Sequence, residues 1–193
     1  NHSDEGGALY LDGGDVSLKH CTFLANTADD NSGLKNASSG DLKIVNSIYW
    51  GNDDISGDVD VSYSNVMGGY DGTGNFNGRP GFTDAENDDL TLLTWSPMIG
   101  RGSTANIVSP DVAGRARADS VAPGLGAYES NLNSPAAYSS VTWHVATTGT
   151  DSAVYGSSAS ANSPFNTLQW AMNHLLEGDS VIIHPGDHAG SAD

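Results

Sequence analysis

The sequence has one cysteine, no secretion signal that we recognise and no long apolar run. Cys21 has no second cysteine with which to form a disulfide within the chain. It lies in a strand-like stretch, so we interpret it as a small buried residue rather than a nucleophile. No apolar run reaches the length of a membrane span, so we expect no membrane insertion. The chain starts with Asn1 rather than Met, so we expect a processed product or a piece of a longer protein.

Basic residues are also scarce. Seven Lys and Arg residues stand against 24 Asp and Glu residues, which gives a net charge of −17. Such a surface repels phosphate backbones and anionic lipids, so we expect no nucleic-acid partner. Two interpretations of the acidity stay open: a highly soluble surface, or carboxylates that bind divalent cations.

What the sequence does contain is short alternating runs separated by Gly, Asn and Asp, which predicts an all-β fold. An internal repeat supports this, because residues 20–26 (HCTFLAN) align with residues 46–52 (NSIYWGN). A weaker copy follows at residues 61–69. Repeats of roughly 20–25 residues built from short strands are typical of solenoids. A β-sandwich is the alternative from the same pattern.

The second part of the chain has a different pattern. Residues 130–142 are small and polar and predict a linker between domains at 1–129 and 143–193. A short helix is predicted from Thr167 to Glu177, before a strand that begins near Ser180. The helix prediction depends on five apolar positions with helical spacing: Leu168, Ala171, Met172, Leu175 and Leu176.

Several short motifs carry a resemblance to a known family. In the first domain they are GGALY at 6–10, NSIYWGN at 46–52, SPMIG at 96–100, DVAGR at 111–115 and GAYE at 126–129. On these motifs, residues 6–129 resemble the C-terminal half of right-handed parallel β-helix proteins of the pectin-lyase-like class. The particular similarity is to bacterial surface proteins of the choice-of-anchor group.

The second domain resembles the opposite end of the same fold. A strand at 143–146 and a Gly-Ser loop at 149–163 precede PFNT at 164–167 and GDSV at 178–181. The resemblance implies a right-handed parallel β-helix with one short capping helix. It also implies a secreted or cell-surface location.

The order of the two halves is unusual, because the end of one solenoid precedes the start of another. Each half leaves an exposed end that must be covered. The predicted assembly interface consists of residues at these two ends: Ala8, Leu9, Tyr10, Leu11, Val181, Ile182 and Ile183. We therefore expect the partner of this chain to be a second copy, joined head to tail in a filament. The alternative is a longer surface protein of which this chain is one stretch.

The resemblance also implies an alternative function, because many proteins of this class cleave acidic polysaccharides. A lyase would need an Arg or Lys base near calcium-binding carboxylates. None of the three lysines (Lys19, Lys35 and Lys43) lies in a matching motif. We therefore expect no catalytic site, and our main hypothesis is a structural or adhesive module. Binding or cleavage of extracellular polysaccharide is the alternative.

Calcium is the one cofactor that the sequence suggests. Oxygen-bearing side chains alternate along one stretch, with Gly57 at the sixth place of a calcium loop. Tyr63 stands where such a loop needs its bidentate Glu. A solvated acidic loop is the alternative. The candidate ligands are Asn52, Asp54, Ser56, Asp58 and Asp60. We discount zinc at His184 and His188, because the intervening Pro-Gly prevents a helix.

Overall fold

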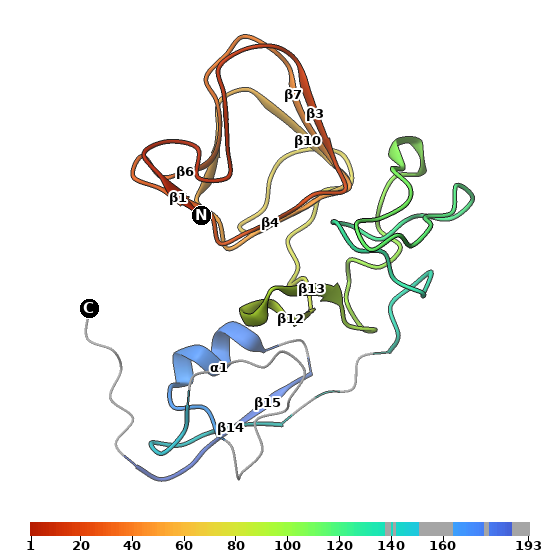
Figure 1. Cartoon of the computed structure of the whole chain (residues 1–193). Coiled ribbons are helices and arrows are strands. Elements are labelled where there is room, and N and C mark those ends of the chain that lie inside the picture. The colour runs from red at the N-terminus through yellow and green to blue at the C-terminus, as the bar shows by residue number, and fades with distance from the viewer. Residues whose placement is uncertain (138–139, 141, 151–163, 176–177, 187–193) are drawn as a thin grey trace. The chain divides into compact units, whose positions relative to one another are not determined.

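The computed structural model describes residues 1–137, 140, 142–150, 164–175 and 178–186. The chain forms two compact units, each considered by itself. Unit 1 contains Asn1–Phe82 and Leu90–Ala136, and unit 2 contains Thr83–Asp89 and Ala137–Asp193. Figure 1 labels their helices and strands.

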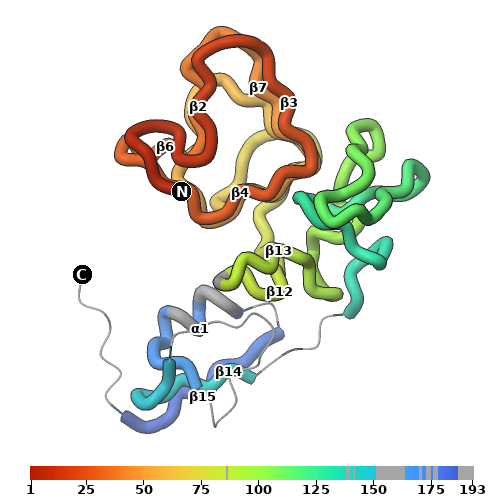
Figure 2. Tube along the Cα trace, viewed as in Figure 1, coloured from red at the N-terminus to blue at the C-terminus, as the bar shows by residue number. Residues whose placement is uncertain are grey.

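In unit 1 the chain runs three times through a similar series of short strands, and we call each run a pass. Pass 1 contains β1 (His2–Ser3), β2 (Leu9–Leu11), β3 (Val16–Lys19) and β4 (Thr22–Leu24). Pass 2 contains β5 (Thr27–Ala28), β6 (Ser32–Asn36), β7 (Leu42–Val45) and β8 (Ile48–Trp50). Pass 3 contains β9 (Asp54–Ser56), β10 (Val59–Ser62) and β11 (Asn65–Val66). Figure 2 shows the red, orange and yellow passes lying one behind another.

Equivalent strands of successive passes pair in parallel. The resulting sheets have the orders β1-β5, β2-β6-β9, β3-β7-β10 and β4-β8-β11. Val16 pairs with Leu42, and Leu42 pairs in turn with Val59. The sequence repeat is therefore a repeat of strand pairing, and the third pass is shorter than the second.

The core of unit 1 follows from period-two alternation along the strands. Leu42 and Ile44 of β7 are each 1% exposed, whereas Lys43 between them is exposed. Val61, the partner of Ile44 on β10, is also 1% exposed. Aliphatic side chains of neighbouring passes thus stack on one another in the interior.

Left-handed residues mark the corners between strands. His20, Asn46 and Tyr63 have φ values of 53°, 54° and 45° and directly follow β3, β7 and β10. A second set of corners follows β4 and β8, at Ala25 and Gly51, with φ values of 53° and 64°. Asn and Gly tolerate this conformation best.

The rest of unit 1 contains little regular structure in its described residues. The strands β12 (Phe82–Asp84) and β13 (Asp89–Leu92) form a two-stranded sheet, and the 3₁₀ turn η1 (Ala85–Asn87) between them belongs to unit 2. A second turn, η2, spans Thr104–Asn106. Beyond it the chain returns to pass 2, where Gly126 N donates to Asn46 O at 2.9 Å.

Unit 2 contains the parallel pair β14 (Thr142–Val145) and β15 (Ser180–Ile183) and the helix α1 (Leu168–His174). Its buried cluster consists of Trp143, Val145, Phe165 and Ala171. The helix begins one residue later than predicted and ends at His174. The predicted positions Leu176 and Glu177, and most of the predicted loop at 149–163, lie outside the described residues.

The all-β prediction is confirmed, because strands dominate and the described part has a single short helix. The strands form six separate small sheets rather than one closed wall. The finer prediction, a right-handed β-helix, therefore stays a prediction.

Candidate functional site

The most distinctive surface of unit 1 is the outer edge of pass 1. The strands β1, β2, β3 and β4 each pair with pass 2 on one side and have no strand partner on the other among the described residues. An edge strand of this kind presents a row of unpaired N–H and C=O groups. We call this outer edge of β1–β4 the open edge.

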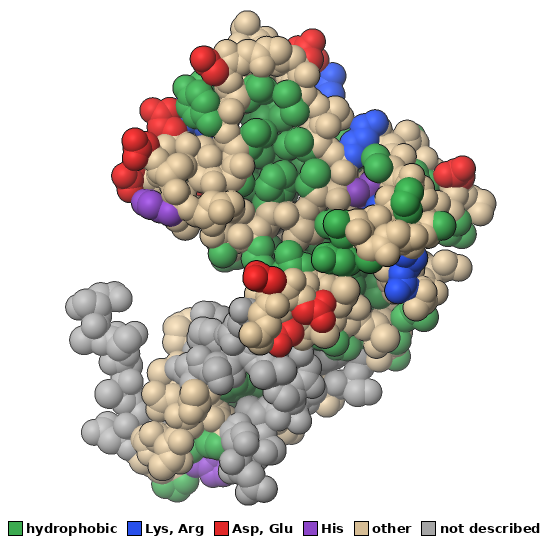
Figure 3. Space-filling view, viewed as in Figure 1, with side chains coloured by type: hydrophobic (Ala, Val, Ile, Leu, Met, Phe, Trp, Pro, Cys, Tyr) green, Lys and Arg blue, Asp and Glu red, His purple; other side chains and the backbone are tan. Residues whose placement is uncertain are grey.

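The apolar interior is also uncovered at the open edge. Four inward side chains of pass 1 are only half-buried, whereas their ladder partners in pass 2 are at most 4% exposed. The half-buried residues are Leu9, Val16, Leu18 and Phe23, and their partners in the same order are Leu34, Leu42, Ile44 and Tyr49. Figure 3 shows hydrophobic side chains gathered on this face of unit 1. Another strand layer would bury them.

The opposite end, at pass 3, is closed by residues 70–78. The Tyr70 hydroxyl donates to Val59 O at 3.2 Å, and Asn75 Nδ2 donates to Val61 O at 2.7 Å. Phe76 forms an isolated parallel bridge with Asn65 of β11. Residues 70–78 thus cover β10 and β11 of pass 3, whereas β9 has no further strand partner among the described residues.

An asparagine ladder crosses the passes. Asn1 Nδ2 donates to Asn26 Oδ1 at 2.9 Å, and Asn26 Nδ2 donates to Asn52 Oδ1 at 2.7 Å. Asn52 Nδ2 donates back to Phe23 O of pass 1 at 2.9 Å. These amides therefore connect equivalent corners of successive passes and support their register.

The predicted interface residues lie on two different strands. Leu9, Tyr10 and Leu11 form β2, and Tyr10 is 45% exposed while Leu11 is buried. Ala8 precedes β2, and its N–H donates to Gly33 O at 2.7 Å.

The other predicted residues, Val181, Ile182 and Ile183, belong to β15. Ile182 and Ile183 are 46% and 51% exposed. The far edge of β15 has no strand partner in the part of the chain that the structure describes.

Sequence reasoning missed Val16, Leu18 and Phe23 as members of the open edge. The signal was present, because these positions precede Leu42, Ile44 and Tyr49 by one repeat. The repeat does not reveal which of its units lies at the outer edge of the sheets.

The candidate calcium ligands are distributed over several elements. Asn52 belongs to the asparagine ladder, and Asp54 and Ser56 are the first and last residues of β9. Asp58 and Asp60 line a hollow of about 50 Å³ that Asp41 and Lys43 also line, and Asn52, Asp54 and Ser56 are not among its lining residues. Among the described residues, no group of three or more His, Cys, Asp and Glu side chains is placed to hold one metal ion.

His184, the other residue weighed as a metal ligand, pairs with a histidine of β14. Its Nε2 lies 2.9 Å from Nδ1 of His144, with the two rings stacked. His188 lies outside the described residues.

The Cys21 side chain is only half-buried, but it remains a poor nucleophile candidate. Burial raises the pKa of the Cys21 thiol, against a weaker opposing effect of a backbone hydrogen bond at Lys19. A raised pKa lowers the fraction of reactive thiolate.

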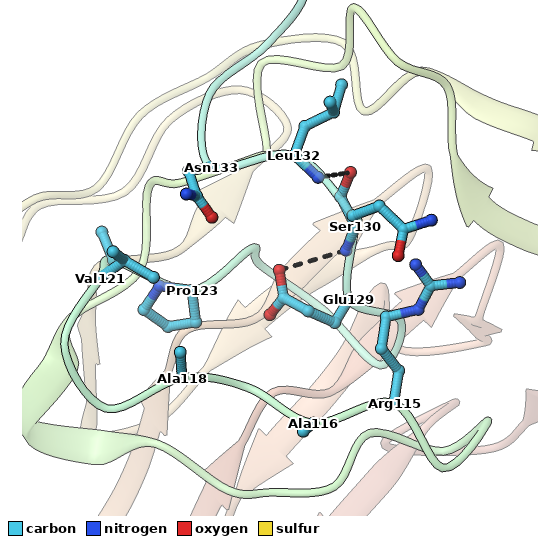
Figure 4. A pocket seen from close by; sticks show the side chains of 11 residues that line it. Arg115, Ala116, Ala118, Val121, Pro123, Glu129, Ser130, Leu132 and Asn133 are labelled. Carbon is cyan, nitrogen blue, oxygen red and sulfur yellow. Dashed lines mark hydrogen bonds between the residues drawn. The ribbon is translucent and has the colours of Figure 1, made fainter.

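A hollow of about 240 Å³ lies between residues 115–123 and 129–133 (Figure 4). Its central carboxylate, Glu129, accepts hydrogen bonds from Gly124 N at 3.0 Å and Ser130 N at 3.1 Å. Glu129 also forms an ion pair of 3.1 Å with the buried Arg117. These contacts occupy the carboxylate, so we assign it a structural role.

Comparisons with protein-family models, curated proteins and solved structures found no match to this chain. No helix in the described part of the chain is long and apolar enough to span a membrane.

Proposed function

We propose that this chain is an extracellular structural or adhesive module that assembles head to tail with further copies. In this proposal the passes of unit 1 are turns of a right-handed parallel β-helix. Parallel ladders between equivalent strands and the asparagine ladder support that architecture. The extracellular location rests on the family resemblance of the motifs.

The observation that carries the proposal is the open edge. It combines unpaired strand groups with half-buried Leu9, Val16, Leu18 and Phe23. Burial of apolar surface is favourable by about 25 cal/mol per Å², and unpaired parallel strands are templates for further pairing. An added strand layer would both pair the free backbone groups and bury the apolar side chains.

Cleavage of an acidic polysaccharide has less support. A lysine base must lose its proton, but ion pairs of 2.8 Å with Asp30 and Glu5 raise the pKa of Lys35. Lys43 forms an ion pair of 3.0 Å with Asp41.

The test is the assembly state of the whole chain by light scattering and electron microscopy, with a variant of the open edge. We expect the wild type to form elongated species and Leu18→Lys to remain monomeric, because the charge would be buried at the joint. The matched control is Val112→Lys, since Val112 is 68% exposed and belongs to no strand. Circular dichroism verifies that both variants fold.

Two results would contradict the proposal. One is a wild-type chain that stays a monomer at all concentrations reached. The other is a Leu18→Lys variant that assembles as readily as Val112→Lys.

A further inference from the structure

We propose that β15 of one copy adds to β3 of a second copy, as the next strand of the sheet β3-β7-β10. This inference rests on the proposed end-to-end assembly and identifies the two strands that form the joint.

The strands of this sheet share one pattern. β3, β7, β10 and β15 each have four residues with two inward aliphatic side chains two positions apart. In the sheet these pairs are Val16 and Leu18, Leu42 and Ile44, and Val59 and Val61, at the first and third strand positions. In β15 the pair is Val181 and Ile183, at the second and fourth positions, which their register with the buried Trp143 and Val145 places on the inward face. β15 therefore repeats the side-chain column of this sheet.

The inward face of β15 is as incomplete as that of β3. Val181 and Ile183 pair in register with Trp143 and Val145, which are 9% and 0% exposed. Ile183 itself is 51% exposed. A further layer is thus missing over β15, just as one is missing over Val16 and Leu18.

The two free edges also have matching directions. In unit 2, β14 precedes β15, so among the described residues β15 leaves free the edge on which a later pass would add. In unit 1, β3 precedes β7, so within the same described part β3 leaves free the edge on which an earlier pass would add. Joining them keeps all strands parallel and leaves both ends available for repetition, as in a heterologous open-ended interface.

The other strands of pass 1 fit β15 less well. β1 has only two residues, and β2 has three. The column of β4 is aromatic, because Phe23 lies opposite Tyr49 of β8. Among the strands of pass 1, only β3 is, like β15, an aliphatic strand of four residues.

The joint predicts a register that a disulfide can test. With Val181 opposite Val16, Ile182 lies opposite Ser17, and both side chains are exposed. Paired strands lie about 4.8 Å apart, within the Cα separations that a disulfide spans. We would introduce Ser17→Cys and Ile182→Cys together in a Cys21→Ser background.

On mild oxidation we expect a series of disulfide-linked multimers larger than dimers, resolved on a non-reducing gel. The matched control combines Tyr10→Cys with Ile182→Cys, because Tyr10, like Ser17, is exposed but lies on β2. This control should give no multimers above the dimers that single-cysteine variants form.

The outcomes separate this inference from the proposed function. If the wild type assembles but the Ser17→Cys, Ile182→Cys pair does not cross-link, the β15–β3 joint is wrong and end-to-end assembly stands. A disulfide within a monomer would also overturn the joint between copies. If the wild type does not assemble at all, both proposals fall.

Discussion

His20 is the residue whose charge the fold suppresses most clearly. It is 5% exposed at the corner after β3, and its Nε2 lies 3.1 Å from Asn46 Nδ2. Its Nδ1 is buried and has no hydrogen-bond partner in the described structure. Burial, followed by the nearby charge of Arg117, lowers the pKa of His20 from 6.5 to about 4. The folded protein therefore holds this imidazole neutral.

We predict that this histidine makes stability depend on pH between about 6.5 and 4. In this window the unfolded chain binds a proton that the folded chain does not, so the free energy of unfolding decreases as the pH falls. The loss amounts to about 3 kcal/mol at most, because one pKa unit corresponds to about 1.4 kcal/mol. Above pH 6.5 this contribution is fully present. Urea denaturation at several pH values measures it.

The control variant is His20→Asn, since Asn46 occupies the equivalent corner with nearly the same φ. Asn does not titrate, so the variant should show a flatter pH dependence of stability across this window. Equal slopes for the wild type and the variant would refute the assignment to His20.

At the scale of elements, the strands were more predictable than the burial of their side chains. Period-two alternation accounts for the buried Leu42 and Ile44 and for the exposed Lys43 between them. The same alternation puts Val45 on the face of Lys43, yet Val45 is only 8% exposed. The next residue, Asn46, donates to Ser103 O at 3.0 Å, so the later segment approaches this corner. Contacts between residues so distant in sequence leave no periodic signal.

The open edge was predictable only in part, again because contacts between residues distant in sequence leave no periodic signal. The repeat identified the strands, and the incomplete solenoid predicted exposed ends at β2 and β15. It did not reveal that residues 70–78 close the end at pass 3, because these residues form a loop with no strand pattern. It also did not reveal that Asn52, one of the candidate calcium ligands, belongs to the asparagine ladder.

A buried ion pair holds together residues 101–129, a segment that follows the strands of unit 1. The side chains of Arg117 and Glu129 are 2% and 9% exposed. Arg117 also donates to Val108 O at 2.9 Å and to Gly126 O at 2.8 Å. One guanidinium thus connects three parts of a segment with few regular elements of its own.

We predict that Arg117→Met destabilises the protein by about 3 kcal/mol, because it leaves the Glu129 carboxylate buried without its counter-charge. The matched control is Arg115→Met, since Arg115 is exposed and only two positions away. The control should change stability by about 0.5 kcal/mol or less. Chemical denaturation of both variants measures the difference. Similar small losses in the two would show that the buried ion pair contributes little.

At the scale of the whole molecule, charge opposes the proposed assembly. The chain carries a net charge of −17, and no Lys or Arg follows Arg117. Copies joined through β15 and β3 would therefore bring acidic surfaces near one another. The apolar contact at the joint must exceed this repulsion, which is long-ranged only at low ionic strength.

We predict that added salt promotes assembly. The Debye length shortens from about 10 Å at 0.1 M salt to about 3 Å at 1 M, which weakens repulsion between copies without weakening apolar burial. The concentration at which scattering rises should therefore fall several-fold between low salt and 0.5 M NaCl. Light scattering across a concentration series at each salt level measures this onset.

Calcium and magnesium at equal ionic strength provide the control. The described residues contain no built cluster of metal ligands, so we expect the two ions to shift the onset equally. A far smaller requirement for calcium would instead place specific carboxylates at the joint. If salt dissolved the assemblies, ion pairs rather than the aliphatic columns of β3 and β15 would hold the copies together, and the joint would have to be reassigned.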